Sequence, residues 1–183
     1  ADKTREAEAG FDGSWVAHPD LVALCREVFD GVLGERPHQL ARTREDVLVG
    51  AAELLDVASA PGERTLAGLR NNISVALQYL HAWLNGTGAV AIFNLMEDAA
   101  TAEIARSQVW QWLHNDVVLD GGTPVTRELV ERLVDEELAT IGQTLGEGYD
   151  ATGFEQARAL FTEVALADDF ADFLTLSAYD RMP

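Results

Sequence analysis

The feature that most limits the fold of this chain is the run from Thr65 to Leu84. Its apolar residues recur at the three- and four-residue spacing of one helix face, and Gly86 follows where a helix end is expected. That face consists of Leu66, Leu69, Ile73, Leu77, Leu80 and Leu84. A helix with one apolar face must bury that face against other elements. Similar spacing recurs over residues 21–34, 98–112 and 125–145, so the sequence predicts a mainly α fold of packed helices.

Two segments have strand character instead. Residues 13–19 hold aromatic and β-branched side chains and end at Pro19, which predicts a short strand that needs partners. The apolar run 89–93 is predicted to cross the core as strand or extended chain. Weaker patterns predict short helices over residues 49–57, 154–165 and 170–174.

Composition excludes several classes of protein. With 48% hydrophobic residues in 183, the chain has enough apolar side chains for a real core, so disorder is excluded. The formal net charge of −18 repels phosphate backbones and anionic membrane surfaces, which argues against nucleic acid as a partner.

Cysteine usage and hydropathy bear on location. The single cysteine, Cys25, excludes an internal disulfide, and no Cys/His cluster has the spacing of a structural zinc site. No window reaches the length of an apolar membrane span, and the first ten residues are too polar for a signal peptide. We expect a cytoplasmic protein with no membrane association, and we expect the charged opening to be the end of something longer.

The informative polar cluster is the segment 93–103, in which an apolar extended stretch delivers Asp98 to the beginning of a helix. An aspartate in that place has two plausible roles. It can cap the helix by accepting backbone N–H bonds. It can also act as a general base that removes a proton from a carbon next to a carbonyl. The two roles are compatible, because a capping geometry fixes where the carboxylate points.

Other candidates are better explained by structure than by chemistry. The four tryptophans, at positions 15, 83, 110 and 112, could line a cofactor pocket, although tryptophans at helical spacing are more often packing residues. The four histidines are scattered without the spacing of a metal site. No glycine-rich phosphate loop and no Gly-x-Ser-x-Gly elbow are present.

Several long strings resemble the C-terminal third of the malate synthases of the shorter type A. These strings are GFDGSWVAHPD (10–20), RNNI (70–73), QY (78–79), NLMEDAATAEI (94–104), QVWQW (108–112) and DFLTL (172–176). They cover essentially the whole chain, in the right order and spacing. One departure is residues 86–92, GTGAVAI, which lack a cysteine and a proline that the family often has there.

The resemblance implies a fold and a domain organisation. Residues 1–34 would be the last strand and helix of a (β/α)8 barrel, residues 35–63 a linker with a short helix, and residues 64–183 a C-terminal helical plug domain. Seven barrel strands would lie outside this chain, in the N-terminal barrel portion of the same enzyme. By itself the chain is therefore expected to be inactive.

The resemblance also implies a reaction, the condensation of acetyl-CoA with glyoxylate to give malate and CoA in the glyoxylate bypass. Asp98 would be the catalytic base. Trp15 and Met96 would line the acetyl and glyoxylate pocket, with Ala17 and Pro19 beside it near the CoA tail. Mg²⁺ would hold the glyoxylate, through acidic ligands in the barrel portion and none in this chain.

Two alternatives remain open. The first is a non-catalytic helical binding or scaffold module that keeps the family's fold, which the lack of metal ligands in this chain favours. The second is a different carbon–carbon lyase of the wider barrel superfamily, and the resemblance of the plug domain argues against it.

Overall fold

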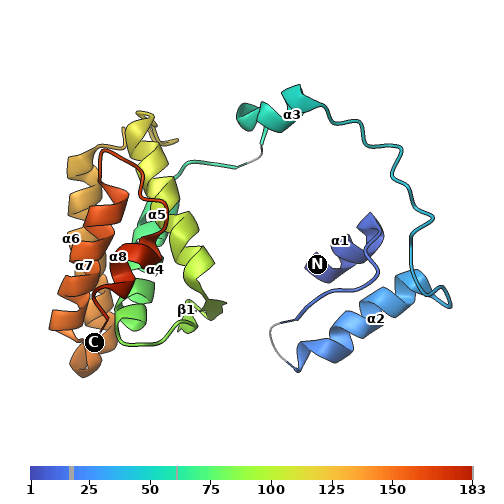
Figure 1. Ribbon diagram of the computed structural model, residues 1–183, viewed down its shortest axis with the longest axis horizontal. Helices are drawn as coiled ribbons and strands as arrows, with labels where there is room; N and C mark the ends of the chain where they lie inside the picture. The colour runs from blue at the N-terminus through green and yellow to red at the C-terminus, as the bar shows by residue number, and fades with distance from the viewer. Residues whose placement is uncertain (17–18, 61, 183) are drawn as a thin grey trace. The chain divides into compact units, whose positions relative to one another are not determined.

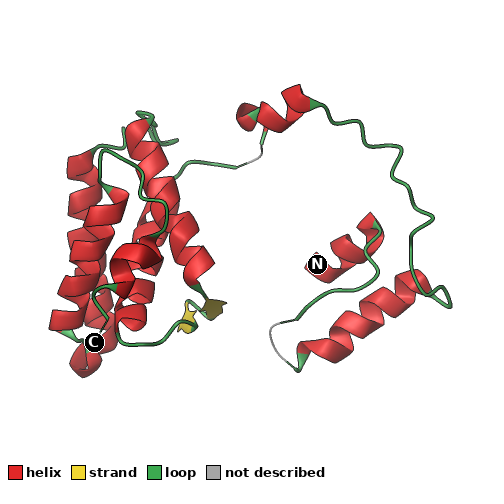
Figure 2. Ribbon diagram, in the orientation of Figure 1, coloured by secondary structure: helices red, strands yellow, loops and turns green. Residues whose placement is uncertain are grey.

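The computed structural model describes residues 1–16, 19–60 and 62–182, and it is mainly helical (Figure 2). The chain divides into two compact units, residues 1–60 and 61–183, and each is described by itself. The predicted fold class is confirmed, whereas the finer division at residues 34 and 63 stays a prediction. No helix in the described ranges is long and apolar enough to cross a membrane.

The first unit contains α1 Asp2–Ala9, α2 Leu21–Leu33, α3 Ala51–Leu55 and the 3₁₀ turn η1 Val57–Ser59. Helices α1 and α2 contact each other around a small core of Ala7, Cys25 and Phe29. The amide of the buried Gln39 donates to the backbone carbonyls of Ala7 and Phe11, at 2.9 and 2.7 Å. This side chain ties the connection after α2 to the end of α1.

The strand predicted over residues 13–19 is absent from the part of it that the structure describes. Residues 13–16 form no β-ladder, and residues 17 and 18 lie outside the described ranges. A strand is stable only when neighbouring strands or a packed face satisfy its backbone groups. The first unit offers this segment helices and loops, so the β propensity of Trp15 and Val16 is not expressed.

The second unit is a helical bundle with a small β-hairpin at one end (Figure 1). It contains α4 Leu66–Leu84, β1 Val90–Ile92, β2 Leu95–Glu97, α5 Ala99–His114, α6 Arg127–Leu145, η2 Gly146–Gly148, α7 Ala151–Ala165 and α8 Leu174–Tyr179. Helix α4 contacts α5, α6, α7 and α8, so it is the centre of the bundle.

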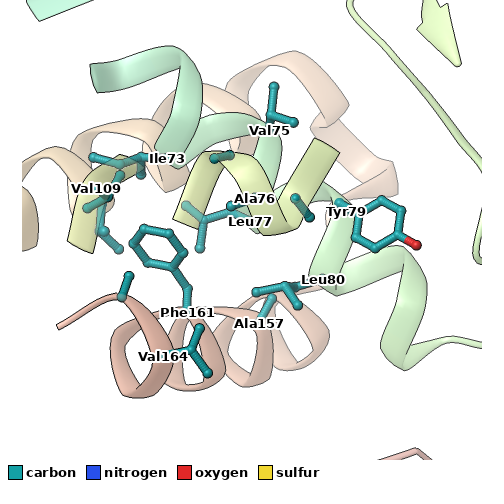
Figure 3. Close-up of a cluster of buried hydrophobic side chains, with 14 of the residues drawn as sticks. Ile73, Val75, Ala76, Leu77, Tyr79, Leu80, Val109, Ala157, Phe161 and Val164 are labelled. Atoms are coloured by element: carbon teal, nitrogen blue, oxygen red, sulfur yellow. The ribbon is translucent and has the colours of Figure 1, made fainter. Parts of the chain in front are cut away.

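The core of this unit forms where the apolar face of α4 meets its neighbours (Figure 3). Ile73 and Leu77 on α4, Val109 on α5 and Phe161 on α7 are fully buried. The predicted face of α4 is buried along its length except at Leu66, which is 43% exposed in the first turn. The apolar face of α4, the strongest pattern in the sequence, is therefore the face around which the bundle packs.

Local capping chemistry fixes where the long helices begin. Thr65 Oγ1 accepts a hydrogen bond from the backbone N–H of Gly68 at 2.9 Å, and Thr126 Oγ1 accepts one from Leu129 at 3.2 Å. Each bond satisfies one of the backbone N–H groups that the first helical turn leaves without a partner. The helices predicted over residues 65–84 and 125–145 therefore begin directly after these threonines.

Replacing Thr65 with alanine is expected to lower the free energy of unfolding by about 1 kcal/mol, because the N–H of Gly68 loses its partner. Urea unfolding of the chain measures the difference. Thr65→Ser is the matched control, since it keeps the hydroxyl, and it should retain most of the stability. Equal losses in the two variants would show that the methyl group matters rather than the cap.

The last predicted helix was misplaced. Residues 170–173 are not helical, and α8 begins only at Leu174. Polar groups on α5 hold the non-helical segment: Trp110 Nε1 donates to the carbonyl of Ala167 at 2.8 Å, and Glu103 Oε2 accepts from the N–H of Leu174 at 2.9 Å. These contacts come from residues distant in the sequence, so no local pattern could reveal them.

Candidate active site

A β-hairpin delivers the candidate base to the start of α5. Strands β1 and β2 are antiparallel, with Val90 opposite Glu97 and Ile92 opposite Leu95. Phe93 and Asn94 form the connecting turn, and both have positive φ values, 49° and 62°. Two central residues with positive φ are characteristic of the two-residue turn that matches the natural twist of a hairpin. The strand predicted over residues 89–93 is present at Val90–Ile92, and it has a partner strand that the sequence did not indicate. The prediction that this segment crosses the core was wrong, because only Ile92 of β1 is buried.

Asp98 follows β2 directly and is the N-cap of α5. Its Oδ1 accepts hydrogen bonds from the backbone N–H groups of Ala100 at 3.0 Å and Thr101 at 3.4 Å. Both bonds use the same oxygen, so the second carboxylate oxygen takes no part in capping. The side chain is exposed. The result is a carboxylate of fixed direction that an external group can reach.

Several large apolar residues lie near Asp98 in the sequence, and their side chains are exposed in this unit. Met96, which the resemblance assigns to the substrate pocket, is 66% exposed, and Leu95 and Phe93 on the same hairpin are exposed to a similar degree. Ile104, one and a half turns into α5, is also exposed. Large apolar side chains next to an aspartate can form one wall of a site that excludes water.

The other predicted pocket residues belong to the first unit. Trp15 is 78% exposed and Pro19 is exposed, while Ala17 lies outside the described residues. The structure therefore brings together Asp98 and Met96, on one hairpin and the helix it enters. The assignment of Trp15, Ala17 and Pro19 to the same pocket stays a prediction.

One polar side chain near the hairpin had been assigned no role. Tyr79 on α4 is fully buried, and its hydroxyl donates to the backbone carbonyl of Gly88 at 2.9 Å. Burial raises the pKa of Tyr79 above its ordinary value, and the negative charge of Asp98 raises it further. The sequence contains the residue inside the string QY (78–79), but nothing local indicates that its hydroxyl reaches the hairpin.

A pocket beside the hairpin is small. It has a volume of about 90 Å³ and lies where the turn residue Phe93 meets α4 and α6, with Gln78 and Glu137 in its wall. Pockets for cofactors and drug-sized ligands usually measure about 300–1,000 Å³. This pocket is therefore too small for a molecule as large as CoA.

Metal ligation has no candidate cluster in this part of the protein. Among residues 1–16, 19–60 and 62–182, no three side chains of the His, Cys, Asp and Glu types come together in a way that could hold a metal ion. The described residues therefore do not fit a Mg²⁺ site.

Family comparisons match both units. A family model described as "Malate synthase, C-terminal" matches residues 63–182, and one described as "Malate synthase, TIM barrel domain" matches residues 1–57. The first match covers the hairpin, Asp98 and the whole helical bundle.

Similar proteins are found in bacteria and plants. A malate synthase of Streptomyces clavuligerus is 57% identical over 183 residues, which is all of this chain and 34% of that protein. Malate synthase A of Escherichia coli is 46% identical over 181 residues, 98% of this chain and 34% of its own length. A glyoxysomal malate synthase of Cucurbita maxima is 46% identical over 185 residues, 99% of this chain and 33% of its own length.

The chain spans about a third of the length of these curated relatives. The matched third includes the end of the barrel domain and the C-terminal domain, which agrees with the mainly helical structure. On these matches the chain belongs to the malate synthase family.

Proposed function

We propose that the full-length protein condenses acetyl-CoA with glyoxylate and water to give malate and CoA, and that Asp98 is the general base. The observation that carries this proposal is the exposed Asp98 carboxylate, fixed at the N-terminus of α5 by two backbone N–H groups, in a chain that matches malate synthases over its whole length. The transfer of an acyl group that becomes an alkyl group places the reaction among the acyltransferases.

The first chemical step is the removal of a proton from the methyl group of acetyl-CoA. The Asp98 carboxylate accepts that proton, and the electron pair of the C–H bond becomes the enolate of the thioester. A thioester α-proton is weakly acidic, so the base must be close, correctly aligned and shielded from water. The cap bonds provide alignment, and the exposed apolar groups of the hairpin supply one wall that can exclude water.

The remaining steps form and then release the product. The enolate carbon bonds to the aldehyde carbon of glyoxylate, and the aldehyde oxygen takes up a proton to become a hydroxyl group. Water then hydrolyses the thioester and frees CoA. Met96 contacts the acetyl group in this proposal, and Trp15, Ala17 and Pro19 border the pocket toward the CoA tail.

Mg²⁺ is proposed as the cofactor of the full-length enzyme, where it would bind and polarise glyoxylate. Its ligands are expected in the barrel portion, which makes that portion a required partner of this chain. A cytoplasmic location is likewise a proposal. The relatives include bacterial proteins and plant proteins that are named glyoxysomal.

The test is an assay of glyoxylate-dependent release of the CoA thiol from acetyl-CoA with Mg²⁺. It is run on this chain alone and on the full-length protein. We expect turnover only in the full-length protein, because the chain alone lacks a cluster that could bind the metal among its described residues. Absence of turnover in both would favour a non-catalytic helical module, and turnover by the chain alone would contradict the expected need for the barrel.

A further inference from the structure

Tyr79 lies at the edge of the aliphatic core, where the bundle meets the hairpin. Figure 3 shows its ring at one end of the cluster, with the hydroxyl directed away from the aliphatic side chains. The ring fills core volume, which phenylalanine would do equally well. The hydroxyl has a separate partner, the carbonyl of Gly88, at 2.9 Å. A buried hydroxyl that lacked such a partner would be costly.

Gly88 is the point at which the chain turns from α4 toward the hairpin. Its backbone sits against the Trp83 ring, since a Cβ added at Gly88 would lie 3.4 Å from Trp83 Cζ3. Trp83 in turn stacks on Tyr79, with ring centroids 6.2 Å apart. Two aromatic residues one turn apart on α4 therefore hold this backbone position, one by a hydrogen bond and one by contact.

The register of the hairpin connects Gly88 to the candidate base. The ladder ends at the pair of Val90 and Glu97, so Gly88 lies two residues before this last pair and Asp98 follows it directly. The carbonyl that Tyr79 holds is therefore two residues from the strand pair that Asp98 follows. A shift of the first strand at its root would move the carboxylate, because the second strand is bonded to the first.

The charge of Asp98 acts on Tyr79 in the same direction as burial. Both raise the pKa of Tyr79, burial more than the charge. The phenol therefore remains protonated at neutral pH and remains a hydrogen-bond donor to Gly88.

We propose that Tyr79 is a positioning residue for the reaction, which holds the root of the hairpin through the Gly88 carbonyl and thereby aligns the Asp98 carboxylate with the methyl group of acetyl-CoA. This proposal rests on the proposed function. Tyr79 does not touch the substrate; it acts through the hairpin and α5.

The test is Tyr79→Phe in the full-length enzyme, which removes the hydroxyl and keeps the ring. We expect kcat to fall on the order of 10-fold, because small displacements of a catalytic group cost about 10- to 100-fold. The KM values for acetyl-CoA and glyoxylate should change little. The primary deuterium isotope effect on kcat, measured with acetyl-CoA deuterated at the methyl group, should rise as proton removal becomes slower. Hydrogen exchange of the amides in residues 90–97 should become faster.

Tyr149→Phe is the matched control. Tyr149 is half-buried in the same unit and stacks on Phe154, with ring centroids 4.9 Å apart. The substitution Tyr149→Phe also removes one phenol hydroxyl, at another place in the bundle. A residue that only stabilises the fold would lower the melting temperature without changing kcat or the isotope effect.

The outcomes separate this inference from the proposed function. If Asp98→Asn is inactive and Tyr79→Phe shows the lower kcat and larger isotope effect, the inference is supported. If Asp98→Asn is inactive while Tyr79→Phe turns over like Tyr149→Phe, the inference is overturned and the proposed function stands. If Asp98→Asn turns over normally, both are overturned.

Discussion

Replacing Asp98 with asparagine in the full-length protein is expected to lower kcat by about 10²- to 10⁴-fold, the usual contribution of a general base. Asparagine has nearly the same shape, and its side-chain oxygen is also a good N-cap acceptor, so α5 should begin at the same place. The KM values and the melting temperature should therefore change little. Steady-state kinetics measure kcat and KM, and thermal unfolding measures the melting temperature.

Glu97→Gln is the control for the change of charge. Glu97 is the preceding residue, at the end of β2, and it is half-buried. Its substitution removes one negative charge from the same hairpin and leaves the cap intact, so turnover should remain close to that of the unmodified enzyme. Near-normal turnover of Asp98→Asn would rule out Asp98 as the base.

The largest expected effect on stability is at Glu103. Its carboxylate pairs with the guanidinium of Arg106 one turn later on α5, and only 1% of the Arg106 side chain is exposed. Arg106 also lies over the Phe170 ring, 4.1 Å from its centroid, and so holds the segment before α8. Glu103→Leu leaves a buried positive charge without its partner, and we expect a loss of about 3–5 kcal/mol in the free energy of unfolding.

The double variant Glu103→Leu with Arg106→Leu tests whether the buried charge causes this loss. Removing both charges eliminates the cost of an unpaired ion, so the double variant should be more stable than Glu103→Leu alone. Urea unfolding of the chain, followed by tryptophan fluorescence, reports on this unit, because Trp83, Trp110 and Trp112 lie within it. Equal or greater destabilisation in the double variant would assign the loss to packing and to the Leu174 N–H, which loses the Glu103 carboxylate in both variants.

The sequence was most informative where structure is determined locally. Helices α4, α5 and α6 begin within two residues of the predicted starts at positions 65, 98 and 125, and each start is fixed by a cap residue that acts on N–H groups two or three positions away. The apolar spacing of α4 predicted its buried face, because helical periodicity selects one side of a helix. Cys25 lies within the predicted helix over residues 21–34 and is buried.

Features that depend on residues distant in the sequence could not be predicted from local patterns. α1 has a polar sequence and carried no clear helical pattern. The second strand of the hairpin follows a Phe-Asn turn, without the glycine that commonly signals such turns. The start of α8 depends on Glu103, whose carboxylate binds the N–H of Leu174 from far away in the sequence.

The candidate site also contains residues that local sequence could predict and residues that it could not. Asp98 could be predicted as a cap from its place before a helix, and its proposed chemistry came from the resemblance of the string 94–104. Tyr79 could not be predicted, because its bond to Gly88 follows from how α4 ends and how the chain returns. The roles of Trp15, Ala17 and Pro19 depend on how the two units meet in the full-length protein.

The two-residue turn at Phe93 and Asn94 restricts the length of the segment between α4 and α5. Side chains alternate between the two faces of a strand, so a single inserted residue would send every later side chain of β2 to the opposite face. Asp98 would remain the cap of α5, because the N–H groups that it binds belong to Ala100 and Thr101, so the helix would have to shift relative to β1. An engineered or evolving relative can therefore exchange side chains between α4 and α5 more freely than it can lengthen or shorten that segment.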